Sequence, residues 1–585
     1  KPLYFYRLHT SNTSSLRKKE TISEAFTVAE KALIRRKQNH LFGLRLNPEA
    51  CQVSLAPKLG PVVIAGMHRS GTSLLALMLQ ALGLDLGEEL LHADDLNPDG
   101  YLEDLCVVQL QRELLQHWTR QCTDSWPDWG WPSDEIAAKE LPPIWTGNAS
   151  DYLEKRQRND RYWGWKDPRS TLLLEHWLAL EPGLRVIGIY RHPWEVIDAL
   201  QRVRPPVFLE NPGWALQIWL EYNQALLRFA KDHPERCVLV NSTALRRQPD
   251  SLPKILEQRW GWEYPRHSNA QGDQLQSFIR RDRLRSLPDD DPLIWLHKSC
   301  HAGARELLRD LDQAADLPSP GSQQPDPTPN RWAAMNGSPM RKAADLAVII
   351  TSHNQGDLLL EALASVMRHA DSDQIELLIV DDGSTDPRTV DILQSLSRIG
   401  FRVLRQHQQG LPVARNAGLS ATQAPILLFL DDDNRLLAPY LVQGVAMLKR
   451  HASIDVVYGN RNDFGFINQL HRVGSICSAD LWTMNRIDNC ALIRRSLLDR
   501  CGGYTAGLPA FEDWDLWLTA LAQPEGLKLG YLDQPCFEYR VRPNSMLQRL
   551  FSNPELQRQL MQQLRQRHGD RVGHGGFRPA PTGDS

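Results

Sequence analysis

The sequence predicts an α/β protein with two domains, each a mainly parallel sheet flanked by helices. Short apolar runs rich in β-branched residues end in polar or glycine-rich loops, which is typical of buried parallel strands. Helical segments follow several of these loops. A stretch rich in Pro, Ser, Gln and Asp at 316–329 divides an earlier group of such units from a later one. Because this stretch can bury little apolar surface, we expect it to be a linker.

The chain therefore divides into five parts. We expect a spacer that contains a helix at 21–37, a first α/β domain, the linker, a second α/β domain, and a carboxy-terminal helix with a flexible tail. The boundaries are set at 1–57, 58–312, 313–343, 344–550 and 551–585. A length of 585 residues is compatible with two or three large units.

Composition limits which partners the protein can bind and in which cellular compartment we expect it. With a formal net charge of −3 the chain lacks the basic balance of a polyanion binder, so nucleic acid is a poor candidate partner. The nine cysteines form no C-x-x-C pair, and an odd count without a framework fits a reducing compartment, so we expect a cytoplasmic protein. No apolar run approaches the roughly 18–20 residues of a membrane helix, although peripheral association with a membrane is compatible with this pattern. The first residues, 1–5, have neither a Met nor the apolar core of a signal peptide, which fits a piece of a longer chain.

The first domain opens with a strand at 61–65, a loop from Gly66 to Ser73 and an apolar helix at 74–82. A strand, a glycine-rich loop and a helix form a phosphate cradle, because backbone N–H groups and the positive end of the helix face the anion. A Walker A loop would have Lys where this chain has Thr72, while Arg69 supplies a positive charge from inside the loop. This departure argues against an ordinary ATPase or kinase. A glycine turn before a core helix is the structural alternative.

Two later segments extend this pattern. A segment at 163–169 carries Lys166 and precedes a helix, and a second strand at 184–190 has Arg191 at its carboxyl end. With the loop, these segments resemble sulfotransferases that use 3′-phosphoadenylyl sulfate (PAPS), over residues 60–265. The resemblance implies that Arg191 grips the 3′-phosphate of the cofactor. It also implies that the 5′-phosphosulfate is held by the loop residues Arg69, Ser70, Gly71, Thr72 and Ser73.

One position departs from this resemblance. The family usually has Ser eight positions after the arginine, and this chain has Ala199 there. A neutral hydrogen bond contributes roughly 0.5–1.5 kcal/mol net, so we expect weaker cofactor binding and not its loss.

Sulfuryl transfer resembles phosphoryl transfer, in which charge on the equatorial and leaving oxygens must be stabilised. We expect Lys166 and Arg69 to supply these cations. A sugar hydroxyl also needs a general base. The string at 97–103 resembles the N-P-x-G-Y-x-E string of bacterial sulfotransferases and makes Glu103 the first candidate, with Glu89 second. For either residue, a surface carboxylate without a chemical role is the alternative.

The second domain carries two acidic clusters, each after an apolar run. Residues 377–380 precede Asp381 and Asp382, and residues 426–430 precede Asp431-Asp432-Asp433. The carboxyl ends of parallel strands are where an open α/β sheet binds its ligand. Carboxylates hold a nucleotide diphosphate only through a divalent metal, so the two clusters predict a cation-binding rim. A solvated turn is the alternative for either cluster alone.

The order of these motifs resembles the family-2 glycosyltransferases of the GT-A fold, over residues 345–545. The resemblance implies a nucleotide-binding loop at 380–386, and it makes Asp431 and Asp433 the D-x-D motif for Mg²⁺ or Mn²⁺. The Glu512-Asp513 pair is similar to the family's motif for the catalytic base, and we expect Asp513 to act, with Glu512 second. One departure is His353, where Tyr is common before Asn354. The implied nucleotide-facing residues are Asn354, Asp381, Asp382, Arg415, Asp431 and Arg540.

Two further interpretations stay open for this domain. An acidic pair at a helix start is also stabilised by the helix dipole, by roughly 0.3–1 kcal/mol, so Glu512 and Asp513 need not be catalytic. Residues 504–505 and 514–517 either line the acceptor pocket or pack in the core.

Together the motifs predict a bifunctional transferase. It would transfer a sugar with inversion from a UDP- or GDP-sugar to a glycan or glycolipid acceptor, and a sulfuryl group from PAPS to a sugar hydroxyl, in the biosynthesis of a sulfated polysaccharide. One rival is an active glycosyltransferase whose sulfotransferase-like domain is degenerate and only binds. A second rival, an ATP-dependent kinase, is disfavoured by the absent loop lysine.

Overall fold

The fold is that of a computed structural model. It describes residues 60–92, 100–118, 129–130, 140–157, 162–203, 205, 207–208, 211, 213–263, 291–320, 344–369, 375–542 and 545–572. The helix expected at 21–37 lies outside the described residues, as do the first three residues of the string at 97–103 and most of the expected linker.

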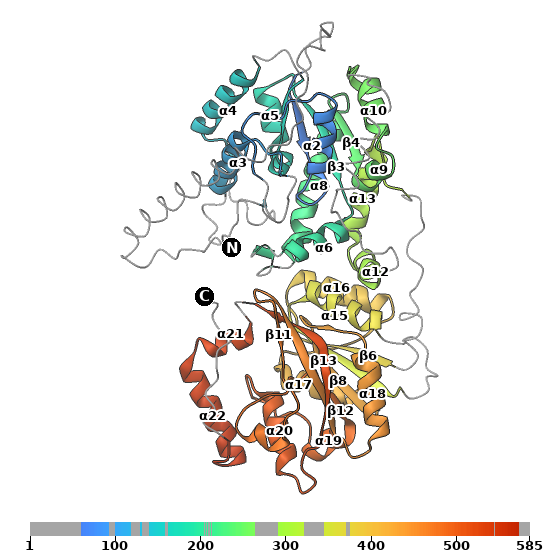
Figure 1. Cartoon of the computed structure of the whole chain (residues 1–585), viewed down its shortest axis with the longest axis vertical. Helices are drawn as coiled ribbons and strands as arrows, with labels where there is room; N and C mark the ends of the chain where they lie inside the picture. Colours follow the sequence, from blue (N-terminus) through green and yellow to red (C-terminus); the bar gives the residue numbers. More distant parts are fainter. Residues whose placement is uncertain are drawn as a thin grey trace, which may run out of the picture. The chain divides into compact units, whose positions relative to one another are not determined.

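The amino-terminal domain is built on a four-stranded parallel sheet (Figure 1). Its strands, in spatial order, are β2 (Gly164–Lys166), β1 (Val62–Ala65), β3 (Arg185–Tyr190) and β4 (Cys237–Asn241). Alternate residues of β1, β3 and β4 enter different hydrophobic clusters; in β1, Val63 and Ala65 belong to one, and Val62 and Ile64 to the other. Both faces of this sheet are therefore covered, as the uninterrupted apolar runs predict.

Helices supply the two covering layers. Helices α3, α4, α8 and α13 contribute to the cluster that contains Val63, and α2 and α10 to the cluster that contains Val62. The helices of this domain are α2 (Thr72–Ala81), α3 (Leu105–Trp118), α4 (Pro143–Arg156), η2 (Pro168–Leu173), α5 (Leu174–Leu180), α6 (Pro193–Val203), α8 (Trp214–Asp232), α9 (Ser242–Arg247), α10 (Ser251–Trp260) and α13 (Ala302–Ala314).

The amino-terminal domain extends beyond its expected boundary at residue 312. Helix α13 continues to Ala314, Leu317 pairs with Val240 at the edge of the sheet, and the Leu239 N–H donates to the Asp316 carboxylate over 2.9 Å. Residues up to 317 therefore pack with the sheet, although their Pro- and Asp-rich surroundings indicate a linker. Helix α12 (Pro292–Cys300) contributes apolar side chains to the hydrophobic cluster of the carboxy-terminal sheet.

The carboxy-terminal domain contains a nine-stranded sheet. Four strands, β7, β6, β5 and β8, run parallel, and the sheet becomes mixed beyond β8 because β12 pairs antiparallel with both β8 and β10. The strands are β5 (Leu346–Ser352), β6 (Ile375–Asp382), β7 (Arg402–Gln406), β8 (Ile426–Asp431), β9 (Arg435–Leu436), β10 (Val456–Gly465), β11 (Gln469–His471), β12 (Leu492–Arg494) and β13 (Leu529–Val541).

Helices flank this sheet and complete the expected interleaving of strands and helices. A Cβ atom on Gly418 would lie 2.4 Å from Ile349 Cγ2, so only glycine lets α17 approach β5 so closely. The helices are α15 (Gly356–His369), α16 (Pro387–Arg398), α17 (Leu411–Ser420), α18 (Tyr440–Arg450), η3 (Ser478–Trp482), α19 (Arg495–Cys501), α20 (Glu512–Ala522), α21 (Met546–Phe551) and α22 (Pro554–His568).

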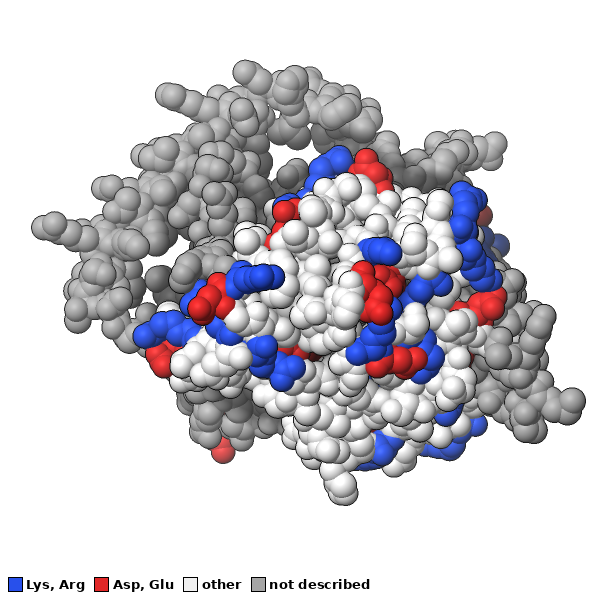
Figure 2. Space-filling view, turned by 90° about the horizontal axis from the view of Figure 1, so that it is seen from below, with Lys and Arg blue, Asp and Glu red and all other residues white. Residues whose placement is uncertain are grey.

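The predicted α/β class with two sheet-based domains is confirmed. On the face drawn in Figure 2, the basic and acidic side chains of the described residues form small mixed groups, in keeping with the nearly balanced charge. Among the residues that the structure describes, no helix combines the length and the apolarity that a membrane crossing requires.

Candidate active sites

The acidic clusters of the carboxy-terminal domain meet at one edge of its sheet. In the parallel register Ser352 lies opposite Asp381, and Thr351 lies opposite Asp431. The carboxyl ends of β5, β6 and β8 are therefore neighbours, as the sequence predicts, and the polar groups that follow them share one rim.

The loop after β6 is held in shape by its own carboxylates. Asp382 accepts hydrogen bonds from the N–H groups of Gln409 and Gly410, over 2.9 and 2.8 Å. Asp381 accepts from the Ser384 N–H over 3.0 Å and is fully buried. Asp382 thus fixes the turn that leads to α17, and Asp381 fixes the loop that follows β6.

Asn354 lies on the same rim and also organises the loop. Its backbone is left-handed, with a φ of 55°, and its side-chain oxygen accepts from the N–H groups of Thr385 and Asp386, each over 2.8 Å. Asn tolerates this conformation better than most residues do. The His353 ring contacts the Asp382 carbonyl over 2.9 Å, so the residue that replaces the usual Tyr packs against the loop.

A buried arginine joins the end of β8 to helix α20. Arg415 on α17 is 1% exposed and donates to Asp431 over 2.8 Å and to Glu512 over 2.6 Å. Burial alone would lower the pKa of Arg415, but Asp431 and Glu512 outweigh it and raise the pKa. The guanidinium therefore stays charged, and it holds β8 and α20 together.

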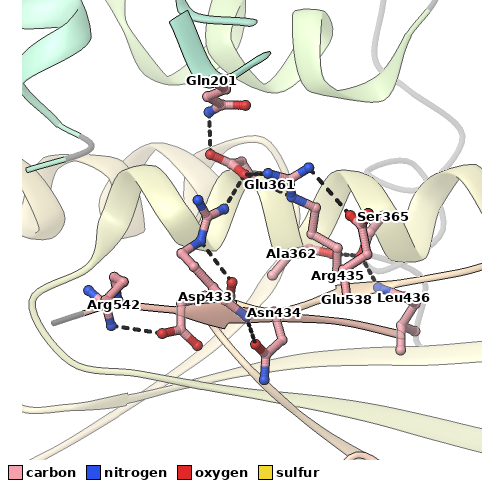
Figure 3. Close-up of polar contacts among 11 residues, drawn as sticks. Gln201, Glu361, Ala362, Ser365, Asp433, Asn434, Arg435, Leu436, Glu538 and Arg542 are labelled. Atoms are coloured by element: carbon pink, nitrogen blue, oxygen red, sulfur yellow. Dashed lines mark hydrogen bonds and ion pairs between the residues drawn. The ribbon is translucent and has the colours of Figure 1, made fainter. Parts of the chain in front are cut away.

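Asp433 is held by Arg540, near the end of β13, and by Arg542, just after it; Figure 3 shows Arg542 beside the Asp433 carboxylate. Arg540 Nε donates to the Asp433 carbonyl over 3.0 Å, and Arg542 donates to its carboxylate over 2.7 Å. Arg540 is itself paired with Glu361 on α15, which also binds Arg435 over 2.8 Å. Burial raises the pKa of Asp433, and Arg542 opposes that shift.

The donor set of this rim fits a hard divalent cation. Asp431 and Asp433 supply carboxylate oxygens, which Mg²⁺ and Mn²⁺ prefer, and their side chains are 33% and 17% exposed. Among the described residues no group of three or more His, Cys, Asp or Glu side chains could enclose a metal by itself. A metal at this rim would therefore use one or two carboxylates and take its other ligands from substrate oxygens and water, as Mg²⁺ commonly does.

Asp513 stands apart from these ion pairs. It lies in the first turn of α20, and its carboxylate accepts from Asn485 over 3.1 Å and from the Trp514 N–H over 2.7 Å. Burial is the main cause that raises the pKa of Asp513 to about 7, and the neighbouring charge of Glu512 adds to it. A carboxyl with this pKa can take up a proton near neutral pH. Trp514 and Trp517 are buried, so they pack in the core.

The glycine-rich loop of the amino-terminal domain joins β1 to α2. Gly71, at the start of α2, has a φ of 101°, and Arg69 has a left-handed φ of 65°, which is unusual for a non-glycine residue. The Gly66 N–H donates to Thr171 Oγ1 over 2.7 Å, which ties the loop to η2. Ser70 is fully buried, and its hydroxyl has no hydrogen-bond partner within the described part of the chain. An anion in the loop would give this hydroxyl a partner, so the loop fits a phosphosulfate group.

Lys166 lies at the carboxyl end of β2, next to this loop, in a buried cluster of charges. Its ammonium contacts one oxygen of Glu103 over 2.5 Å, and Arg169 contacts the other over 3.1 Å. Glu103 is 3% exposed, so it can reach a substrate hydroxyl only if these contacts are released. Glu89 is exposed, and its carboxylate is not part of this cluster.

Arg191 follows β3 and contacts the same loop. It is 1% exposed, its Nε donates to Glu195 over 3.1 Å, and its Nη1 donates to the Arg69 carbonyl over 3.1 Å. Ala199 lies two turns further along α6 and is buried.

Several residues at these sites are not found by the motifs. Asn485 contacts Asp513, Arg542 contacts Asp433, and Glu361 anchors Arg540. Arg542 could have been noticed from its position two residues after Arg540. Asn485 and Glu361 carry no local signal, because only the packing of distant segments brings them to the site.

Family models match both domains. The model described as Sulfotransferase family matches residues 61–265, and the model described as Glycosyl transferase family 2 matches residues 347–507. These ranges contain the glycine-rich loop, Lys166 and Arg191 in the first domain, and the two acidic clusters in the second.

Known proteins resemble parts of the chain. An uncharacterized glycosyltransferase of Haemophilus influenzae is 25% identical over 187 residues, which cover 31% of this chain and 63% of that protein. The Campylobacter jejuni GalNAc(5)-diNAcBac-PP-undecaprenol beta-1,3-glucosyltransferase is 31% identical over 119 residues, which cover 20% of this chain and 37% of that protein. The solved structure of S. aureus TarS 1–349 in complex with UDP-GlcNAc has a TM-score of 0.32 and 19% identity, and covers 38% of this chain and 65% of that one.

The chain thus spans less than two thirds of each of these relatives, and the family models cover its two domains separately. This protein joins a domain that matches the sulfotransferase family to a domain that matches glycosyl transferase family 2.

Proposed function

We propose that the carboxy-terminal domain transfers a sugar from a UDP- or GDP-sugar to a glycan or glycolipid acceptor, with inversion. One observation carries this proposal: a single buried arginine connects a group of carboxylates that can bind a metal to a helix that carries a possible base. Arg415 links the acidic rim, which suits a metal and a diphosphate, to the helix that bears Asp513. An inverting displacement needs both, a stabilised leaving group and a base near the acceptor hydroxyl.

On the donor side, Asp431 and Asp433 would hold Mg²⁺ or Mn²⁺. Such a cation supplies charge stabilisation for the departing diphosphate. Asp381, Asp382 and Asn354 shape the loop against which the nucleotide would lie. Arg540 and Arg542 both contact Asp433 and so place two positive charges beside the proposed metal ligands.

On the acceptor side, Asp513 would take the proton of the attacking hydroxyl. Its raised pKa, about 7, makes it a stronger base than an ordinary carboxylate and still leaves it ionised in a large fraction of molecules near neutral pH. Glu512 is the weaker candidate, because Arg415 holds one of its oxygens over 2.6 Å. The lipid-linked glycan in the name of the Campylobacter relative supports a glycolipid as one form of acceptor.

We further propose that the amino-terminal domain transfers a sulfuryl group from PAPS to a sugar hydroxyl. Arg69, Ser70, Gly71, Thr72 and Ser73 would hold the 5′-phosphosulfate, as the strained loop and the unpartnered Ser70 hydroxyl support. Lys166 would face the transferring group, because β2 ends beside the loop. Arg191 would bind the 3′-phosphate.

Two residues are candidates for the general base of sulfuryl transfer, one buried in ion pairs and the other exposed. Glu103 is close to Lys166 but has both oxygens engaged by cations, whereas Glu89 is exposed. Glu103→Gln and Glu89→Gln separate them: the variant of the true base loses sulfuryl transfer while it keeps binding 3′-phosphoadenosine 5′-phosphate.

Nucleotide binding followed by turnover tests the sulfotransferase proposal. Thermal shift should show that 3′-phosphoadenosine 5′-phosphate stabilises the protein and that ATP does not, since the loop has Thr72 in place of a P-loop lysine. Sulfuryl transfer from radiolabelled PAPS to a sugar acceptor then distinguishes an enzyme from a degenerate domain that only binds. Stabilisation by ATP alone would contradict the proposal.

A further inference from the structure

The helix that bears the proposed base is held from behind by the carboxy-terminal helix. Helix α22 lies beyond residue 507, where the match to the family model ends. Its Leu560 and Leu564 share a hydrophobic cluster with Phe511, Trp514 and other residues around α20. In Figure 1, α22 lies beside α20.

The polar centre of this contact is Asp515, two residues after Asp513. Its side chain is 1% exposed, and it contacts His568 Nε2 over 2.7 Å and Arg567 Nε over 2.8 Å. Thr505 Oγ1 donates to the other oxygen over 2.6 Å. Burial alone would raise the pKa of Asp515, but the hydrogen bonds from His568, Thr505 and Arg567 outweigh it and lower the pKa. The carboxylate is therefore ionised and paired.

This contact continues toward Arg415. Arg567 Nη2 donates to Thr505 Oγ1 over 2.7 Å. The preceding residue, Tyr504, exchanges two backbone hydrogen bonds with the Asn416 side chain, over 2.7 and 2.8 Å. Asn416 follows Arg415 on α17, so the same helix contacts both Tyr504 and Glu512. The first turn of α20 is therefore fixed on one side by Arg415, through Glu512, and on the other by α22, through Asp515.

Asp513 has few contacts of its own that could set its direction. Its side chain accepts from Asn485 and from the adjacent Trp514 N–H. Its aim therefore depends on the orientation of the whole first turn of α20. A reacting group displaced by about 1 Å can cost on the order of a hundredfold in rate.

We propose that His568 and Arg567 are positioning residues, which act through Asp515 to aim Asp513 at the acceptor hydroxyl. This inference rests on the proposed function of Asp513 as the base. The carboxy-terminal helix is then part of the glycosyltransferase site, which it reaches through Asp515.

The test compares variants of α22 in the full chain. His568→Ala should lower kcat for sugar transfer about ten- to a hundredfold, while KM for the nucleotide-sugar changes less than about twofold. His568→Gln keeps a side-chain N–H donor and should restore most of kcat. Arg558→Ala is the matched control, because Arg558 lies on the same helix, is 77% exposed and pairs only with Glu555 among the ion pairs of the described residues.

A double-mutant cycle separates this inference from the base assignment. In an Asp513→Asn background, His568→Ala should cause no further loss of kcat. An unchanged kcat in His568→Ala, or equal losses in both backgrounds, would overturn the positioning role. If Asp513→Asn is as active as the wild type, the base assignment fails instead. If His568→Ala does not fold, Arg567→Ala, which removes the other α22 contact to Asp515, takes its place in both backgrounds.

Discussion

The two sites use buried charge in opposite ways. In the carboxy-terminal domain the ion pairs do not include the proposed base: Arg415 pairs with Asp431 and Glu512, whereas Asp513 has a carboxyl with a raised pKa. In the amino-terminal domain the ion pairs include the first candidate base, since Glu103 is held by Lys166 and Arg169. The first arrangement is ready to accept a proton, whereas the second has to open before Glu103 can act. Four experiments test this contrast.

The largest effect is expected at the metal motif. Asp433→Ala should reduce sugar transfer to background, because the diphosphate would lose the cation that stabilises its departure. Excess chelator should abolish turnover of the wild type as well. Asp345→Ala is the control, because Asp345 is half exposed and pairs with Lys449 on the surface. Full activity of Asp433→Ala in the presence of chelator would end the metal assignment.

The next effect concerns the base of the ready site. Asp513→Asn keeps size and hydrogen bonding but loses basicity, so kcat should fall roughly a hundredfold or more with nearly unchanged donor binding. The wild-type kcat should rise with pH through about 7, as Asp513 loses its proton, and the variant should lack this limb. The folded protein holds the proton of Asp513 more tightly than the unfolded chain, so this group costs stability as pH rises from about 4 to 7. Asp513→Asn should therefore unfold at a higher temperature than the wild type at pH 8, and a lower one would contradict the raised pKa.

A smaller effect should appear at the nucleotide of the amino-terminal site. Arg191→Ala should weaken binding of 3′-phosphoadenosine 5′-phosphate about ten- to a hundredfold, since a charge-assisted contact to phosphate is worth roughly 1.5–3 kcal/mol. Binding of adenosine 5′-phosphate, which lacks the 3′-phosphate, should barely change. Calorimetry with both nucleotides makes the comparison. Because Arg191 also binds the Arg69 carbonyl, equal losses for both would mean that it only shapes the loop.

The smallest effect is a gain. Ala199→Ser adds the hydroxyl that the resemblance to PAPS-dependent sulfotransferases implies at this position, and it should tighten 3′-phosphoadenosine 5′-phosphate binding about two- to tenfold. Ala199→Val is the control, because it adds bulk without a hydroxyl at the same buried position. Equal affinity of Ala199→Ser and the wild type would show that the missing hydroxyl does not limit the cofactor site.

Sequence patterns predicted the parts of both sites that lie at strand ends. The apolar runs before Asp381 and Asp431 placed both clusters at the carboxyl ends of parallel strands, and the register brings them together. The glycine-rich loop was found for the same reason, because a strand, a turn and a helix are local features.

The rest depends on contacts between distant segments. No local pattern shows that Glu103 meets Lys166, 63 positions away, or that Glu361 meets Arg540, 179 positions away. The antiparallel pairing of β12 was missed for a similar reason, since a short apolar run does not indicate the direction of its neighbour. Residues 313–317 were assigned to the linker on composition, yet Leu317 is held at the edge of the sheet by β4.

The Arg415 link also limits how this enzyme could be recombined with its relatives. Any chimera that joins the donor half of one glycosyltransferase to the acceptor half of another between residues 416 and 511 separates this arginine from Glu512. If the incoming half lacks a carboxylate at that position, a buried guanidinium loses one of its two carboxylate partners, which destabilises the chimera. Exchange of acceptor specificity by module swapping should therefore succeed when the arginine and the glutamate are transferred together.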